Sequence, residues 1–135
     1  MKTKKELRFD KDDYSSDRLS DLFIQQFKLQ DRLGNIKKIK SSPEMKQKYI
    51  NQMILAIHEE AVEIMRETAY KNPDYVEFGW KKGQKFDNEK FKEEIVDIWH
   101  FVLNLCIVAD MDSDELVARF FNKNQENHKR QDDGY

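Results

Sequence analysis

Apolar side chains recur at helical spacing along most of the chain. Four stretches, at about residues 19–33, 43–67, 91–105 and 113–121, repeat an apolar residue every third or fourth position. Only 4 glycines and 2 prolines interrupt the sequence, whereas 37% of its residues are charged and 39% are hydrophobic. A composition poor in turn-forming residues favours long helices over many short strands. The pattern therefore predicts an all-α fold, a helical bundle of about four to five helices.

Capping residues indicate where these helices begin and end. Ser42 followed by a proline is a favourable start for the second helix, and Asp87 can cap the third. Ser113, with two acids directly behind it, is a suitable start for the fourth helix. Gly34 with Asn35 is an end signal for the first helix.

Two segments break the helical pattern. Residues 71–90 contain Pro73 and two glycines and set aromatic residues among lysines, so they predict a loop. Residues 1–18 are dense in charge and thin in apolar residues, which is typical of an arm that does not fold by itself. We therefore expect a charged N-terminal arm, residues 1–18, and one domain, residues 19–135.

Charge and cysteine content exclude several classes of protein. The formal net charge of −2 gives no overall attraction to nucleic acid or to an anionic membrane. Cys106 is the single cysteine and lies in an apolar run, so a buried thiol is expected and a disulfide framework is excluded. No signal-peptide core and no run long enough for a membrane span is present. These features predict a cytoplasmic protein without nucleic-acid or membrane partners.

Paired acids stand beside the apolar stripes of two helices. In "HEEAVEI" Glu60 and Glu63 lie roughly 60° and 120° to one side of the stripe, at about 100° per residue. In "EEIVDIWHF" Glu94 and Asp97 lie roughly 40° and 100° to the same side of theirs. If the two helices are neighbours, four carboxylates converge and repel one another unless protons or a cation neutralise them.

A hard divalent cation is the natural partner of such a cluster. Oxygen ligands suit Mg²⁺ or Mn²⁺ rather than Zn²⁺, and Val62 stands where a zinc HExxH motif needs its second histidine. The alternative is that the acids are solvated helix flanks matched to lysines. His58 and His100 are predicted on the outer faces of their helices, and no serine, cysteine or histidine group suggests a covalent nucleophile.

The C-terminal segment carries a second cluster. Lys123, Asn127 and Arg130 are spaced at i, i+4 and i+7, and share one face if the helix continues past Phe121. Two cations beside an amide can hold a polyphosphate. The alternative is a frayed, charged terminus.

Four of these segments together resemble a known family. "LFIQQFKLQDRL", "EEAVEI", "EEIVDIWHF" and "KNQENHKRQDDGY" are similar to the dimeric, all-α dUTPase family, relatives of the MazG-like nucleotide pyrophosphatases. The resemblance covers roughly residues 20–135 and is nearest to the short bacterial and phage forms. The acidic motifs are shared by the wider superfamily, whereas the C-terminal motif is narrower.

The resemblance implies roles for individual residues. It implies that the Mg²⁺ ligands are Glu60, Glu63, Glu94 and Asp97. Either Glu60 or Glu63 would also act catalytically on the attacking water. It implies phosphate contacts at Lys82, Lys123, Arg130 and Tyr135. It implies base or sugar contacts at Gln26, Gln30, Trp80 and Asn127.

The activity that the resemblance implies is Mg²⁺-dependent hydrolysis of dUTP to dUMP and pyrophosphate, with Mn²⁺ as a substitute. Such an enzyme would limit uracil in DNA and supply dUMP. A dCTP or broader noncanonical nucleotide pyrophosphatase is the alternative, and a non-catalytic helical module that binds proteins is a second. A homodimer or dimer of dimers is expected, because a monomer would leave apolar stripes exposed.

Overall fold

A computed structural model describes residues 17–134 and contains five helices and no strand in that range. The helices are α1 (Arg18–Arg32), α2 (Asn35–Ser41), α3 (Pro43–Arg66), α4 (Asn88–Val108) and α5 (Ser113–Asp132). The predicted all-α class is therefore confirmed. The charged arm up to residue 16, and Tyr135, lie outside the described residues.

Side-chain caps start the long helices where the sequence predicts them. Ser42 accepts a hydrogen bond from the backbone N–H of Met45 at 3.1 Å, and Asp87 accepts one from Lys90 at 3.1 Å. α5 begins at Ser113 as predicted, but its capping side chain belongs to Asp112. These caps satisfy N–H groups that have no partner inside a helix.

Two helical segments extend beyond the four stretches with apolar periodicity. The stretch after Gly34 forms the short helix α2, because Gly34 takes a left-handed backbone (φ +77°) and the chain resumes a helix directly behind it. The polar C-terminal stretch does not fray at Phe121: α5 continues to Asp132.

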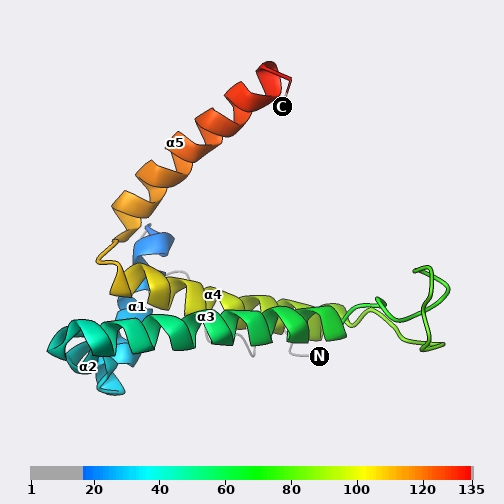
Figure 1. Ribbon diagram of the computed structural model, residues 1–135, viewed down its shortest axis with the longest axis horizontal. Helices are drawn as coiled ribbons and strands as arrows, with labels where there is room; N and C mark the ends of the chain where they lie inside the picture. Colours follow the sequence, from blue (N-terminus) through cyan, green and yellow to red (C-terminus); the bar gives the residue numbers. More distant parts are fainter. Residues whose placement is uncertain (1–16, 135) are drawn as a thin grey trace.

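The helices form a long hairpin with two additions (Figure 1). α3 and α4 lie side by side and are joined by the loop of residues 67–87 at one end. At the other end, α1 and α2 pack against them, and α5 leaves the body after α4 and projects away from the hairpin. The described residues contain no helix that is long and apolar enough to cross a membrane.

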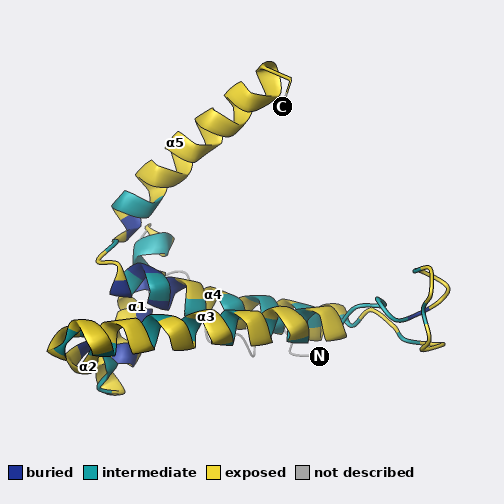
Figure 2. Ribbon diagram, in the orientation of Figure 1, coloured by how far each residue is buried: buried dark blue, intermediate teal, exposed yellow. Residues whose placement is uncertain are grey.

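The core is small and lies where α1 meets α4. It is formed by Phe23, Leu103 and Cys106, with Leu19 and Leu116 packed against it, so the prediction of a buried thiol is confirmed. Figure 2 shows that the outer surface of α3 and nearly all of α5 are exposed. Buried residues concentrate on α1 and on the second half of α4, which packs these two helices against each other.

Candidate metal centre

Three of the four predicted acids meet between α3 and α4. Glu60 comes from α3, and Glu94 and Asp97 come from successive turns of α4. One carboxylate oxygen from each of the three lies within 4.8 Å of the others. Glu60 and Glu94 are half-buried and Asp97 is exposed, so the cluster opens to solvent on one side. The prediction that the two acidic flanks face each other is confirmed for these three residues.

Two oxygens of this cluster lack a hydrogen-bond donor. Glu60 Oε2 and Glu94 Oε2 are buried, and no donor reaches them within the described residues. An ionised carboxylate can only accept hydrogen bonds, so two of them side by side cannot satisfy each other. A buried acceptor without a partner is costly, which means that a proton or a cation has to fill the gap between them.

The electrostatics of Glu60 and Glu94 also favour a bound proton or cation. Burial, the adjoining Glu94 carboxyl and the charges of Glu63 and Asp97 raise the pKa of Glu60 to about 7. Burial also raises the pKa of Glu94, and the nearby Glu63 and Asp97 add to the effect. Loss of water and accumulation of like charge both penalise the ionised form, and a bound cation would reverse both penalties.

The donor set fits a hard divalent cation. All three converging ligands are carboxylate oxygens, without sulfur or nitrogen, as Mg²⁺ and Mn²⁺ prefer. Glu63 lies one turn beyond Glu60 and acts on the cluster through its side-chain contact with Glu94 and through its charge, but is not in the tight group of three. The structure therefore separates the predicted four ligands into three converging acids and a fourth at their edge.

Gln26 is buried in a hydrogen-bonded network between α1 and α4. Its Nε2 donates to Asn104 Oδ1 at 2.7 Å, and its Oε1 lies 2.7 Å from His100 Nδ1, which acts as the donor. Asn104 Nδ2 in turn lies 3.4 Å from the sulfur of Met53 on α3. Gln26 is 4% exposed, so its immediate neighbours are protein groups.

Gln30 is the centre of a second network that joins three helices. Its Oε1 accepts hydrogen bonds from Asn35 Nδ2 on α2 at 2.8 Å and from the Tyr49 hydroxyl on α3 at 2.9 Å. Burial raises the pKa of Tyr49 to about 12, so this hydroxyl stays a donor at neutral pH. Both predicted glutamines thus lie on the buried face of α1, at the α2 end of the hairpin.

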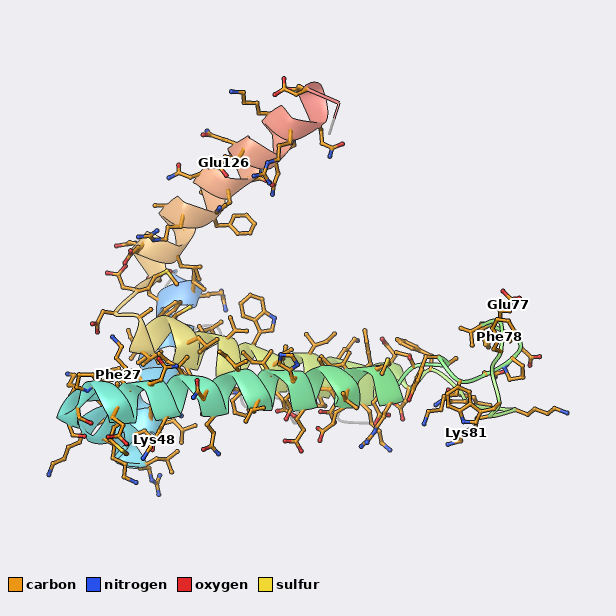
Figure 3. The ribbon with its side chains drawn as sticks, in the orientation of Figure 1. Phe27, Lys48, Glu77, Phe78, Lys81 and Glu126 are labelled. Carbon is orange, nitrogen blue, oxygen red and sulfur yellow. The ribbon has the colours of Figure 1, made fainter. Side chains whose placement is uncertain are left out.

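Trp80 and Lys82 lie at the opposite end, in the loop of residues 67–87, where Phe78 and Lys81 also project (Figure 3). The Trp80 side chain is 72% exposed and the nearby Lys71 amine contacts its ring. The loop is held by its own backbone, since the Lys71 carbonyl accepts from the N–H groups of both Trp80 and Lys81 at 2.9 Å. Within one chain, the structure does not bring Trp80 together with the two glutamines.

The C-terminal cluster is also separate from the acids. Lys123, Asn127 and Arg130 lie on the exposed part of α5, which projects away from α3 and α4 (Figure 1). Lys123 forms an i,i+3 ion pair with Glu126 at 3.8 Å. Helix geometry therefore confirms that these residues share a helix, but one chain in this conformation does not bring them to the metal centre.

Sequence reasoning missed three residues that contact the two predicted glutamines. His58 is exposed as predicted, and so is much of His100, but the His100 ring reaches inward to Gln26. Asn104 is an amide inside the apolar run "FVLNLCIVA", a signal for a buried polar contact. Tyr49 falls within an apolar stripe of the sequence, and nothing in the sequence indicates that its hydroxyl donates a hydrogen bond to Gln30.

Comparisons with known proteins identify a family and two relatives. Residues 18–113 match the model of a protein family described as dUTPase. The chain is 43% identical over 49 residues to the dCTP pyrophosphatase of Enterobacteria phage T4, which is 36% of this chain and 29% of that protein. It is 38% identical over 64 residues to the dCTP pyrophosphatase of Enterobacteria phage LZ5, which is 45% of this chain and 37% of that protein.

The aligned segments span less than two-fifths of either phage protein. No solved structure matches the chain. The family match, by contrast, covers more than half of the chain and includes both acidic helix segments, α1 and the connecting loop. On that match, together with the all-helical fold and the converging acids, the chain belongs to the all-α dUTPase family.

Proposed function

We propose that the protein is a metal-dependent pyrophosphatase that hydrolyses a pyrimidine deoxynucleoside triphosphate to the monophosphate and pyrophosphate. The observation that carries this proposal is the cluster of Glu60, Glu94 and Asp97, in which two buried carboxylate oxygens lack a donor. A cluster of this kind is suited to a cation that also accepts phosphate oxygens.

Mg²⁺ is the proposed ion, with Mn²⁺ as a substitute, because all three ligands are oxygens. When bound, such an ion neutralises the polyphosphate charge and favours ionisation of water. Glu60, Glu94 and Asp97 would hold the ion, and the half-buried positions of Glu60 and Glu94 would limit competing water on their side. To Glu63, at the edge of the group, we assign the orientation of the attacking water and the uptake of its proton on a carboxylate oxygen.

Two pyrimidine substrates are candidates. The family match favours dUTP, and dUMP formation would then limit uracil in DNA. The names of both phage relatives favour dCTP as the second candidate. Uracil and cytosine differ at one edge of the ring, and an amide side chain can present either a donor or an acceptor to that edge.

The phosphate contacts of Lys123 and Arg130, with Asn127 beside the nucleotide, require a change in the position of α5 or a second copy of the chain. Lys82 is the proposed contact from the loop, with Trp80 as a wall of the nucleotide site. A cytoplasmic homodimer, or a dimer of dimers, is the assembly we propose.

A non-catalytic helical module that binds proteins is the rival from another class. Such a module could use the acids as an interface, but would gain nothing from buried carboxylate oxygens that lack donors. Only an enzyme loses turnover, while remaining folded, when one acid is neutralised.

The test is pyrophosphate release with Mg²⁺ from dUTP, dCTP, dTTP, dATP, dGTP and UTP in parallel, with Glu60→Ala as control. Selective turnover of dUTP that the control lacks supports the first candidate, and preferential turnover of dCTP supports the second. No turnover of any nucleotide by folded protein that binds Mg²⁺ would refute the enzymatic proposal.

A further inference from the structure

A cleft lies between α2 and α3, at the end of the hairpin away from the loop. Its volume is about 430 Å³, within the range typical of small-molecule sites. The residues that line this α2–α3 cleft include Asn35, Lys38, Lys48, Tyr49, Gln52 and Met53. Lys48 marks its position in Figure 3, far along α3 from the labelled loop residues.

Two residues of the cleft, Tyr49 and Met53, share the Glu60 face of α3, whereas Gln52 lies about 80° to one side of it. Met53 precedes Glu60 by seven residues and Tyr49 precedes it by eleven, which places both within about 20° of Glu60 around the helix at 100° per residue. Along the helix axis they are about 10 and 17 Å from Glu60, at 1.5 Å per residue. That separation is of the same order as the distance from base to polyphosphate in an extended nucleotide.

α4 follows the same line from the acids to the cleft. Asn104, seven residues after the Asp97 of the acidic cluster, contacts the sulfur of Met53 at the edge of the cleft. The buried network of Gln26 therefore lies between the metal centre and the cleft. This network supplies polar groups along part of the path from the acids to the cleft.

The groups in the cleft are partly fixed and partly available. Asn35 donates its Nδ2 to Gln30, so its Oδ1 is the atom left to accept from a ligand, with no partner among the described residues. Gln52 is exposed and offers both a donor and an acceptor. Met53 provides an apolar surface suited to the face of a ring, and Lys38 adds a donor at the rim.

We propose that the α2–α3 cleft binds the nucleoside part of the substrate while its polyphosphate lies on the acids. This inference rests on the proposed function, and it assigns the base to cleft residues of α2 and α3. Gln30 then acts as a positioning residue, since it holds Asn35 and Tyr49 in place with two hydrogen bonds. Trp80, at the other end of the hairpin, would not contact the nucleoside bound to the same chain.

The test blocks the cleft without touching the acids. Gln52→Trp fills it, and Gln47→Trp is the matched control, because Gln47 is exposed on the same helix and does not line the cleft. Both variants are first shown to be folded and to keep the wild-type oligomeric state and the wild-type melting shift with Mg²⁺. Gln52→Ala is the milder second variant at the cleft.

KM is measured for the deoxynucleotide that the wild type hydrolyses best. Gln52→Trp is expected to raise this KM at least about tenfold, because a pocket discriminates by about this factor against a ligand that does not fit. Gln52→Ala should raise KM less, and Gln47→Trp should not change it. Equal KM values for Gln52→Trp and Gln47→Trp would overturn the cleft assignment and leave the proposed activity intact.

Calorimetric binding of a non-hydrolysable α,β-imido deoxynucleoside triphosphate with Mg²⁺ separates the two proposals. If the wild type shows no turnover but binds the analogue, and Gln52→Trp weakens that binding about tenfold, the cleft is supported and the activity is not. If the wild type does not bind the analogue, both proposals fail.

Discussion

Glu60 and Glu63 occupy successive turns of one helix, but their surroundings differ. Glu60 shares a pocket with two acids of α4, and one of its oxygens is buried without a donor. Glu63 lies outside the tight group and influences it through charge. Glu60 is therefore suited to binding a cation, and Glu63 to accepting a proton.

Neutralising each glutamate in turn should separate these tasks. Glu60→Gln is expected to abolish both the Mg²⁺-induced rise in melting temperature and turnover, because it removes a charged ligand. Glu63→Gln should keep the melting shift while kcat falls about 10²–10⁴-fold, the usual contribution of a general base. Thermal unfolding with and without Mg²⁺, alongside steady-state kinetics, measures both. Loss of the Mg²⁺ shift in both variants would mean that all four acids are ligands.

The raised pKa of Glu60 predicts how stability depends on pH. Its pKa is about 7 in the folded protein and 4.5 ordinarily, so the folded state binds the proton more tightly. This contribution to the stability of the metal-free protein is complete below about pH 4.5 and is lost as the pH rises through about 7. Mg²⁺ requires deprotonated acids, so its stabilising effect should be larger at about pH 8 than at about pH 5.5.

Melting temperatures at both pH values, with and without Mg²⁺, test that dependence. The Glu60→Gln variant is the control, since its side chain does not titrate and its metal-free stability should vary less over this range. An Mg²⁺ shift of the same size at both pH values would contradict the assignment.

Helix α4 contains the residues that position the metal centre. Its acids face α3 near the start of the helix, whereas Asn104 and Cys106 pack near its end. Gln26 joins α1 to this helix through two buried hydrogen bonds. The network therefore fixes the position of α1 relative to the face that holds the acids.

Gln26→Leu is expected to lower the free energy of unfolding by about 1–3 kcal/mol, because it leaves Asn104 Oδ1 and His100 Nδ1 without their partner. Gln25→Leu is the matched control on the exposed side of the same helix and should have little effect. Urea denaturation measures both variants. Equal stability of the two would show that the network contributes nothing to the fold.

The long helices could be predicted from the sequence because their apolar period and their caps are local features. Ser42 and Asp87 cap the helices as the sequence indicates, and the acids fall on the predicted flanks. The inward contact of His100 could not be predicted, because helical phase gives its direction but not the reach of its ring. The path of α5 depends on how α4 ends, which no local pattern encodes.

The whole molecule is a hairpin with little core of its own. Only Phe23, Ile36, Leu103, Cys106 and Val108 form the buried hydrophobic set among the described residues. On α3, Leu55 is 70% exposed and Val62 is 42% exposed. They lie on the side opposite Glu60, seven residues apart, and form a short exposed apolar stripe among polar residues such as Asn51 and His58. Exposed stripes of this kind predict association with a second copy.

Light scattering after size exclusion should therefore give a mass of at least two chains. Replacing Leu55 and Val62 together by glutamate should increase the monomer fraction, because charge on the stripe opposes association. Lys46→Glu is the control, since Lys46 is exposed on the same helix away from the stripe. A wild-type protein that elutes as a monomer at every concentration would contradict the proposed assembly.

The measurement that tests the central claim most directly is a titration with Mn²⁺ followed by NMR line broadening. A paramagnetic ion broadens the amide signals nearest to it, so the site is located as well as detected. We expect the signals of residues 57–66 and 91–100 to broaden first, at less than one Mn²⁺ per chain, and Mg²⁺ to restore them. Broadening spread evenly over the exposed acids of α5, with the α3 and α4 signals unaffected, would contradict it.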